Sequence, residues 1–391
     1  MLVKKRRAAG AATVSVLIAA AVVASGVGSG NTAQAAPGPG NCGTLSDFST
    51  HCYAAAAQGT RASSLPVYMS GVGADLEVDC LAVANDADEF ANWEMWISTN
   101  DTDPNSTADS GYWVEEGYTA GTVYDARGNY AGFQWFWADN RPGGGYNEHF
   151  IQWATAYQYK NVTFTYEGGP NWGVYLGGTL VGQSIDNGAY AGGTEIGAEM
   201  AVDGNGQTHA HAQNWQYTNG GAWSWVDPTF TGYYNNVPSF VLTWAYAPTG
   251  VTVHTPLQPC GTTPQVAQQA PAATGSALSL AAIRSITAGA TTSYATTAAP
   301  TSTTTVQTTR GSANALYGSE VNGAAAAEPV YLVQELGSFS TSRVSPDGGA
   351  VHAINGNAMH FVISATTGQV LDWGITGAVN LAPLGSVTAL S

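Results

Sequence analysis

Basic residues are scarce in this 391-residue chain, which has 11 lysines and arginines against 27 aspartates and glutamates. Four of the basic residues, Lys4 to Arg7, lie at the N-terminus, and without residues 1–35 the chain keeps 7 basic and 27 acidic residues, a net charge of −20. Phosphate binding requires clustered Lys and Arg. We therefore expect no nucleic-acid partner and no binding to an anionic membrane surface.

Long apolar runs are absent except near the N-terminus. There, Lys4 to Arg7 precede an apolar stretch over residues 8–27, and Ala33-Gln34-Ala35 supplies the small-x-small pattern of a cleavage site. These features predict a secretory signal peptide over residues 1–35. A membrane anchor is the alternative, but Ser15, Ser25 and Gly26 interrupt the run. We expect a secreted, extracellular monomer with no membrane span after signal removal; attachment to the cell wall stays open.

Cysteine is also scarce, with four residues at Cys42, Cys52, Cys80 and Cys260. None forms the close Cys-x-x-Cys spacing of a zinc site, and we expect no metal and no other cofactor. An even number of cysteines in an exported chain favours disulfides. Of the three possible pairings we expect Cys42–Cys52 with Cys80–Cys260, because the second bond would tie the two ends of one domain.

Composition changes sharply near residue 264. Residues 36–264 carry 22 of the 27 acids and nearly all the tryptophan, whereas residues 265–312 are dominated by Ala, Thr, Ser, Gln and Pro. We predict a β-sandwich domain over 36–264, a Thr/Ala/Ser-rich linker over 265–312 and a small α+β module over 313–391. A short helix around Leu278–Ile286 is an option within the linker. In the module, the strands His360–Ser364 and Val370–Ile375 would pair through Thr366-Thr367-Gly368.

The first domain lacks helical periodicity and instead shows short strand-like runs separated by Gly, Asn, Asp and Pro. This pattern predicts an all-β antiparallel sandwich or jelly roll. The expected strands are Leu81–Ala84, Asn92–Ser98, Gly111–Tyr118, Gly132–Ala138, His149–Ala154, Asn161–Tyr166, Gly173–Leu180, Thr194–Val202, Ala210–Tyr217, Ala222–Val226 and Phe240–Tyr246.

Glutamates on two of these strands are the candidate chemical groups. In Thr194–Val202 the apolar residues alternate, so Glu195 and Glu199 project from the opposite face with Gly197 between them. In Tyr112–Tyr118 only one of the adjacent Glu115 and Glu116 can share that face, and Glu115 lies on the face of Trp113 and Gly117. Carboxyl groups that converge from neighbouring strands would form a general acid/base pair over an open groove. Acids that merely solvate an outward sheet face are the alternative.

These motifs resemble a known family. Fungal glutamic peptidases (eqolisins) carry Ala-Glu-x-x-x-Glu on one strand, preceded upstream by a (Gln/Glu)-x-Gly strand. Thr194-Glu195…Glu199 is similar to the former and Glu115-Glu116-Gly117 to the latter. Gly197-Ala198-Glu199 also loosely resembles the Gly-Gly-Glu strand of neprosin-type glutamic peptidases. Phe133–Trp137 and Asn171–Tyr175 look like the family's aromatic strands.

The resemblance implies a concanavalin A-like double sheet and endopeptidase activity at acidic pH. One glutamate would activate water, and its partner would polarise the carbonyl and stabilise the oxyanion. By this resemblance Glu195 is the base, Glu115 is the partner and Glu199 is the rival of Glu195. The side chains expected to bind substrate are Trp113, Gln134, Trp135, Trp137 and Trp172.

Two other functions compete. Glu-Ile-Gly-Ala-Glu also resembles the Glu-x-Asp-x-Glu strand of laminarinase-type glycoside hydrolases, although Gly197 stands where the intervening Asp should be. A non-catalytic, lectin-like module that binds carbohydrate through its tryptophans is the third hypothesis. Its most suggestive pair is Trp223 and Trp225, which share one strand face. The substrate would accordingly be a polypeptide or a polysaccharide.

Overall fold

The structure is a computed structural model. It describes residues 52–59, 69–83, 90–100, 112–125, 128–141, 145–154, 160–188, 190–200, 206–226, 232–235, 241–245, 250–254, 277–297, 299–344 and 351–390. The expected signal peptide, Cys42 and Cys260 lie outside these residues. Cys52 and Cys80 begin or lie within described strands, but their side chains are not described, so the disulfides stay a prediction.

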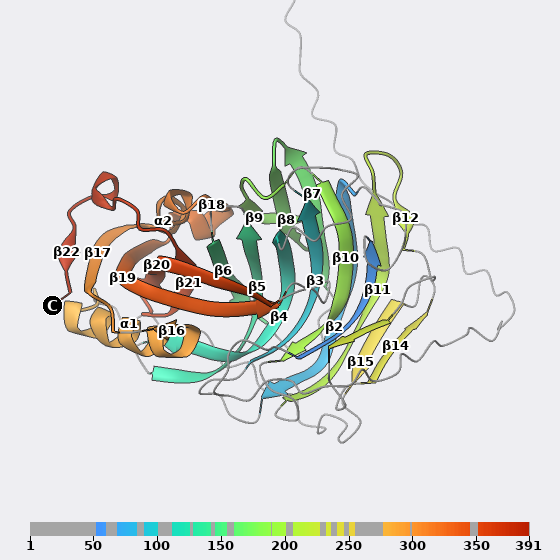
Figure 1. The fold of residues 1–391 in the computed structure, drawn as a ribbon, viewed down its shortest axis with the longest axis horizontal. Helices are drawn as coiled ribbons and strands as arrows, with labels where there is room; N and C mark the ends of the chain where they lie inside the picture. Colours follow the sequence, from blue (N-terminus) through green and yellow to red (C-terminus); the bar gives the residue numbers. More distant parts are fainter. Residues whose placement is uncertain are drawn as a thin grey trace, which may run out of the picture. The chain divides into compact units, whose positions relative to one another are not determined.

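The described strands form two antiparallel sheets that pack as a sandwich (Figure 1). Sheet A runs, in spatial order, β13 (Gly232–Asn235), β1 (Cys52–Gly59), β10 (Tyr190–Met200), β3 (Phe90–Asn100), β4 (Tyr112–Asp125), β5 (Gly128–Arg141), β6 (Gly145–Trp153), β21 (Val370–Thr376), β20 (Val351–Ser364), β19 (Pro329–Val344), β17 (Ser302–Thr309) and β22 (Thr388–Ala389), with β16 (Thr296–Thr297) also on β19. Sheet B runs β14 (Val241–Ala245), β15 (Gly250–His254), β11 (Gly206–Thr218), β2 (Gly71–Val83), β7 (Lys160–Gly168), β8 (Asn171–Leu176), β9 (Thr179–Ser184) and β18 (Ser319–Val321), with β12 (Ser224–Trp225) on β11. The two-sheet antiparallel sandwich predicted from the sequence is confirmed.

Helices are few among the described residues. They are α1 (Leu280–Tyr294), α2 (Arg310–Leu316) and the 3-10 turns η1 (Gly323–Ala327) and η2 (Ala382–Leu384). No helix in these ranges combines the length and the apolar character needed to cross a membrane.

The central strands of sheet A are buried on both faces. Its inner face packs on sheet B through Trp93, Met95 and Ile97 of β3. Its outer face carries Trp96 and Phe136, which pack in a second apolar cluster with residues of the C-terminal part. Double burial explains why β5 reads Phe133-Gln134-Trp135-Phe136-Trp137 without polar alternation, whereas β7 in sheet B alternates. In β7, Val162 and Phe164 are buried and the threonines between them are partly exposed.

The C-terminal part differs from expectation. Residues 265–312 do not form a linker throughout, because the described portion contains α1, β16, β17 and the start of α2. The short helix considered around Leu278–Ile286 is confirmed as α1, which Ser279 caps by accepting from the Ala282 backbone N–H at 3.1 Å. The composition was misleading because threonines form strand β17, and because Thr287 and Thr291 of α1 are buried.

The C-terminal strands also continue sheet A rather than forming a sheet of their own. The predicted pairing of His360–Ser364 with Val370–Ile375 is confirmed as the β20–β21 hairpin. Gly368 in its turn has a φ of 75°, a conformation that glycine adopts without strain. β21 then pairs with β6, which brings Asp372 opposite His149.

A buried ion pair lies at this β6–β21 joint. Arg310 Nη2 and Nε donate to the two carboxylate oxygens of Asp372 at 2.6 and 2.8 Å. The same carboxylate lies 3.0 Å from His149 Nδ1 and accepts from Asn314 Nδ2 at 2.9 Å. Burial alone would raise the pKa of Asp372, but the charge and hydrogen bonds of Arg310, helped by His149, hold it below its usual range. Both carboxylate oxygens of Asp372 are therefore hydrogen-bonded, which offsets part of the cost of desolvating the charges.

His360 lies beside this network. Its ring stacks on Tyr317 at a centroid distance of 3.6 Å, and both side chains are buried. Burial lowers the pKa of His360 to about 3; His149 and Arg141 act in the same direction and Asp372 opposes them. The folded protein thus keeps this imidazole neutral at pH values where an exposed histidine is charged.

His360 predicts a specific dependence of stability on pH. As pH falls below about 6.5, the unfolded histidine takes up a proton that the folded one refuses, so its contribution is lost between pH 6.5 and 3 at up to about 1.4 kcal/mol per pH unit. We expect His360→Gln to unfold at lower urea concentration than the wild type at pH 7.5, and this deficit to shrink or reverse at pH 4.5. Urea titrations at both pH values measure it. An equal difference in urea midpoint between the two proteins at pH 7.5 and at pH 4.5 would contradict the prediction.

Candidate functional site

Three neighbouring strands of sheet A bring glutamates to its outer face. β3 lies between β10 and β4, and the register places Glu94 opposite Gly197 on one side and Gly117 on the other. Glu115 lies opposite Trp96, and Glu199 lies opposite Asn92. Because side chains alternate along a strand, all of these residues share one face, and the glutamates form a diagonal row across it.

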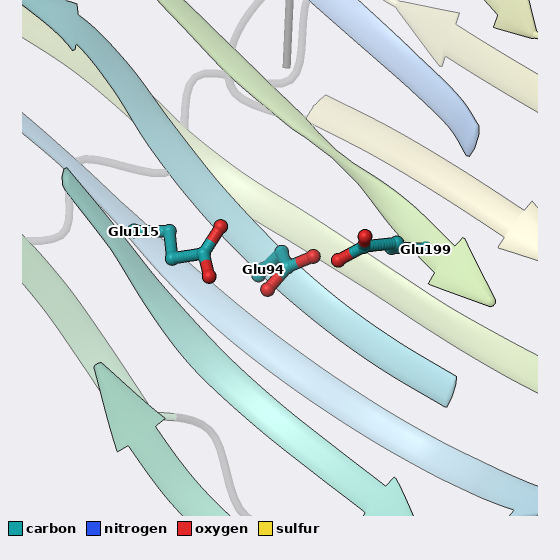
Figure 2. A group of neighbouring side chains, drawn as sticks. All are labelled: Glu94, Glu115 and Glu199. Carbon is teal, nitrogen blue, oxygen red and sulfur yellow. The ribbon is translucent and has the colours of Figure 1, made fainter. Parts of the chain in front are cut away.

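The carboxyl groups of Glu94, Glu115 and Glu199 meet at this face. One oxygen from each lies within 4.8 Å of the others. Figure 2 shows the three side chains pointing toward one another, with Glu94 in the middle. They are 0%, 6% and 2% exposed, respectively. Three carboxyl groups this close cannot all be ionised without strong mutual repulsion, so the cluster must share protons or hold a cation.

Two side chains of β3 donate hydrogen bonds to the cluster. Trp96 Nε1 donates to Glu115 Oε2 at 2.7 Å, and Asn92 Nδ2 donates to Glu199 Oε2 at 3.2 Å. A donor favours the ionised form of the carboxyl group that accepts from it, and the shorter bond favours it more. Both bonds therefore favour an ionised acceptor in the cluster.

A glycine makes room for the central carboxyl group. A Cβ at Gly117 would clash with the Trp93 carbonyl oxygen and with the Glu94 side chain. Any larger residue at position 117 would push Glu94 away from the sheet, so the Gly of Glu115-Glu116-Gly117 has a steric role in the cluster.

The adjacent Glu116 points the opposite way, as strand alternation predicts. It is fully buried between the two sheets. Burial raises its pKa well above the usual value, although a hydrogen bond with the Thr163 backbone opposes the shift. Glu116 is therefore held protonated inside the sandwich and does not belong to the cluster.

Glu195, the base that the family resemblance implies, also lies on the outer face of sheet A. It is directly opposite Trp96, which in turn is opposite Glu115, so Trp96 stands between the two glutamates. Glu195 is 4% exposed. The indole of Trp96 lies on the same face and donates its hydrogen bond to Glu115. Of the two glutamates on β10, Glu199 is the one that lies in the cluster with Glu115.

The predicted substrate-binding residues separate onto two faces. Trp113 and Gln134 lie on the glutamate face, and both are buried. For Trp135, Trp137 and Trp172 the expectation is wrong, because all three pack in the core between the sheets. Trp135 lies against Tyr118, and Trp172 Nε1 donates to the Gly188 carbonyl at 3.0 Å. Their large apolar surfaces stabilise the sandwich instead.

The expected open groove over the glutamates is also wrong. All four glutamates of the face are at most 6% exposed, and apolar side chains of α1 pack in the same cluster as Trp96 and Trp113.

The sequence analysis missed Glu94 because this residue stands alone between Trp93 and Met95. The signal that could have found it is its alternation with Asn92 and Trp96, two further polar or hydrogen-bonding side chains on one strand face.

The cluster has the ligand chemistry of a hard divalent cation as well as that of a proton-sharing site. Carboxylate oxygens are the ligands that calcium and magnesium prefer, but these ions require six or more oxygens. Among the described residues the three glutamates supply one oxygen each to the group. A cation would therefore depend on several additional ligands, whereas shared protons require none.

Neither a protein-family model nor a curated protein matches the chain. Several solved structures are similar to part of it. Scytalido-glutamic peptidase with a peptide-based transition-state analogue matches with a TM-score of 0.36 and 10% identity, over 52% of this chain and 98% of that one. A second structure of that peptidase, with a transition-state analogue inhibitor, gives a TM-score of 0.37 at 10% identity over the same shares. SCP-B, a member of the eqolisin family of peptidases in complex with the tripeptide Ala-Ile-His, gives 0.33 at 11% identity, again over 52% and 98%.

Glu94→Gln tests the crowding of carboxyl groups. The substitution keeps the side-chain shape but removes one ionisable group from the centre of the cluster, so we expect a higher melting temperature than the wild type at pH 8 and little difference at pH 4. Thermal unfolding at the two pH values measures it. Glu320→Gln, at an exposed position of β18, is the matched control and should change neither value. A Glu94→Gln protein that is less stable at pH 8 would contradict mutual repulsion as the dominant effect.

Proposed function

We propose that the protein is an endopeptidase that works at acidic pH with paired glutamates. The observation that carries the proposal is the convergence of Glu115, Glu199 and Glu94 from three strands onto one face. Paired carboxyl groups in different protonation states supply both a base and an acid without a metal. The likeness of Glu115-Glu116-Gly117 and Glu195…Glu199 to glutamic-peptidase motifs supports the same reaction class. We also propose that the chain is secreted, as its N-terminal sequence predicts.

The hydrogen bonds suggest a division of roles. Glu115, ionised beside the Trp96 indole N–H, takes a proton from a water molecule whose oxygen attacks the peptide carbonyl carbon. Glu199, kept protonated by the neighbouring carboxyl groups, donates a hydrogen bond and then its proton to the carbonyl oxygen. When the tetrahedral intermediate collapses, the C–N bond breaks and the proton held by Glu115 passes to the leaving amine. The hydroxyl that Glu199 protonated returns its proton to Glu199 as the carbonyl re-forms, which restores both glutamates. Glu94 is a positioning residue that keeps one proton in the cluster.

The glycosidase alternative draws less support from this geometry. It would use Glu195 and Glu199, two residues of the same strand, as nucleophile and acid. The described cluster instead joins Glu199 to Glu94 and Glu115 on the neighbouring strands.

Amide substitutions test the peptidase directly. We expect the full-length protein to hydrolyse denatured protein between pH 2 and 7, with the rate reduced at least about 100-fold in Glu115→Gln and in Glu199→Gln. Glu320→Gln is the control and should keep full activity. Glu195→Gln decides which glutamate of β10 acts, and the geometry predicts that this variant retains activity. Full activity in both Glu115→Gln and Glu199→Gln would contradict the proposal, and loss of activity with EDTA would favour a bound cation over shared protons.

Carbohydrate binding is a second candidate function, carried by one specific observation. Trp223 and Trp225 beside the β11–β12 pair are 44% and 39% exposed, whereas most of the other tryptophans are buried. Exposed aromatic faces stack on sugar rings. Trp223→Ala/Trp225→Ala should therefore lose retention on an insoluble polysaccharide column that the wild type shows. Val387→Ala, at another exposed apolar residue, should not, and equal retention of all three proteins would contradict the assignment.

A further inference from the structure

The outer face of sheet A beside Glu115 packs against the chain's own C-terminal part. α1 presents Ile283, Ile286 and Ala290 along one side, at the spacing of a helix face. These residues belong to one apolar cluster with Trp96 and Trp113, the two tryptophans that flank Glu115 on the outer face of sheet A. α1 lies against β4 and β5, the strands that carry Glu115 and Gln134.

Other described residues of the C-terminal part extend this cover. Phe339 of β19 and Ile354 of β20 belong to the same apolar cluster. Gln369, in the turn before β21, donates from Nε2 to Oε1 of Gln134 at 3.2 Å. Figure 1 shows α1 beside the β19–β21 strands, which continue sheet A beyond β6.

Hydrogen bonds tie α1 to the C-terminal strands, and these strands to the sandwich. Thr291 of α1 donates to Glu335 of β19 at 2.6 Å, which ties the helix to the C-terminal strands. The C-terminal strands are tied to the sandwich at β6–β21, where Arg310 and Asp372 pair, and at β18, which pairs with β9 of sheet B. Arg141 of β5 also donates to the Tyr317 carbonyl oxygen. α1 itself reaches the glutamate face through apolar contacts.

The composition of this interface favours a functional role over a structural one. Burying carboxyl groups against apolar side chains costs free energy, and apolar residues of similar size would hold a permanent interface better. Glu94, Glu115, Glu195 and Glu199 nevertheless lie on this face, each at most 6% exposed. Carboxyl groups in such a place are explained if the face is uncovered in the working state of the protein.

We propose that the described residues 277–297, 299–344 and 351–390 form an autoinhibitory cover, and that the glutamate cluster meets substrate only after α1 leaves the outer face of sheet A. The inhibitory role of this cover rests on the proposed peptidase function. The covering contact itself can be tested without any measurement of catalysis.

The test compares the full chain with Ile283→Asp/Ile286→Asp, which places charges in the buried side of α1. Leu280→Asp/Ala288→Asp is the matched control, because both positions are exposed on the same helix. The readout is carbodiimide-driven coupling of glycine ethyl ester to carboxyl groups, followed by mass spectrometry of the peptides that contain Glu94, Glu115 and Glu199. We expect coupling at these glutamates to rise about tenfold in the core variant and not in the control, while coupling at Glu320 stays constant.

Hydrolysis of denatured protein is measured on the same samples. A rise in coupling together with a rise in hydrolysis supports both the cover and the peptidase. A rise in coupling without hydrolysis at any pH supports the cover and overturns the peptidase. Coupling that does not rise in the core variant overturns the cover, whatever the hydrolysis result.

A milder variant keeps the test valid if Ile283→Asp/Ile286→Asp unfolds the whole protein. Ile283→Ala removes apolar contact from α1 without adding charge, and should raise coupling at the same glutamates several-fold while the circular dichroism of the sheets is unchanged. Coupling that equals the wild type in Ile283→Ala, with α1 destabilised by hydrogen exchange, would likewise overturn the cover.

Discussion

The pairing of β21 with β6 is the contact on which the rest of the structure depends. It extends sheet A into the C-terminal part, and it brings the hairpin of β19 and β20 and the helix α1 to the outer face. At its centre Asp372 accepts from Arg310 and Asn314 and lies beside His149. An ion pair buried this deeply is stable only while every partner remains, because removal of one leaves an uncompensated charge. The joint is therefore specific to this set of partners.

Double burial of sheet A follows from this joint and explains the unusual position of the glutamates. A sandwich alone would leave the outer face of β3, β4 and β10 in water, where carboxyl groups carry no desolvation cost. With the C-terminal part in place, the same face holds Trp96, Trp113 and four buried glutamates. Carboxyl groups are expected on a solvent-exposed face, whereas the apolar packing over them is that of a closed interface. An autoinhibitory cover reconciles these two properties.

The sequence predicted what depends on local alternation. The two-sheet architecture, the opposite directions of Glu115 and Glu116, and the β20–β21 hairpin all follow from period-two patterns and a glycine turn. What it could not supply depends on contacts distant in the chain. The burial of Trp135 and Trp137 between sheets, the central place of Glu94 and the covering of the face by Ile283 each require knowing which strand is the neighbour. Composition failed for residues 265–312, since threonine-rich segments form strands when a partner strand is present.

Acid acts in opposite directions on the sandwich and on the joint. Burial raises the pKa of Glu116 between the sheets and of Glu335 beneath α1, so both contribute stability that is present at low pH and lost as pH rises. The lowered pKa values of His360 and Asp372 at the joint have the reverse effect, since their contribution is lost as pH falls. Acidification thus strengthens the core of the sandwich and the attachment of α1 to β19, while it weakens the tie between the C-terminal part and β6.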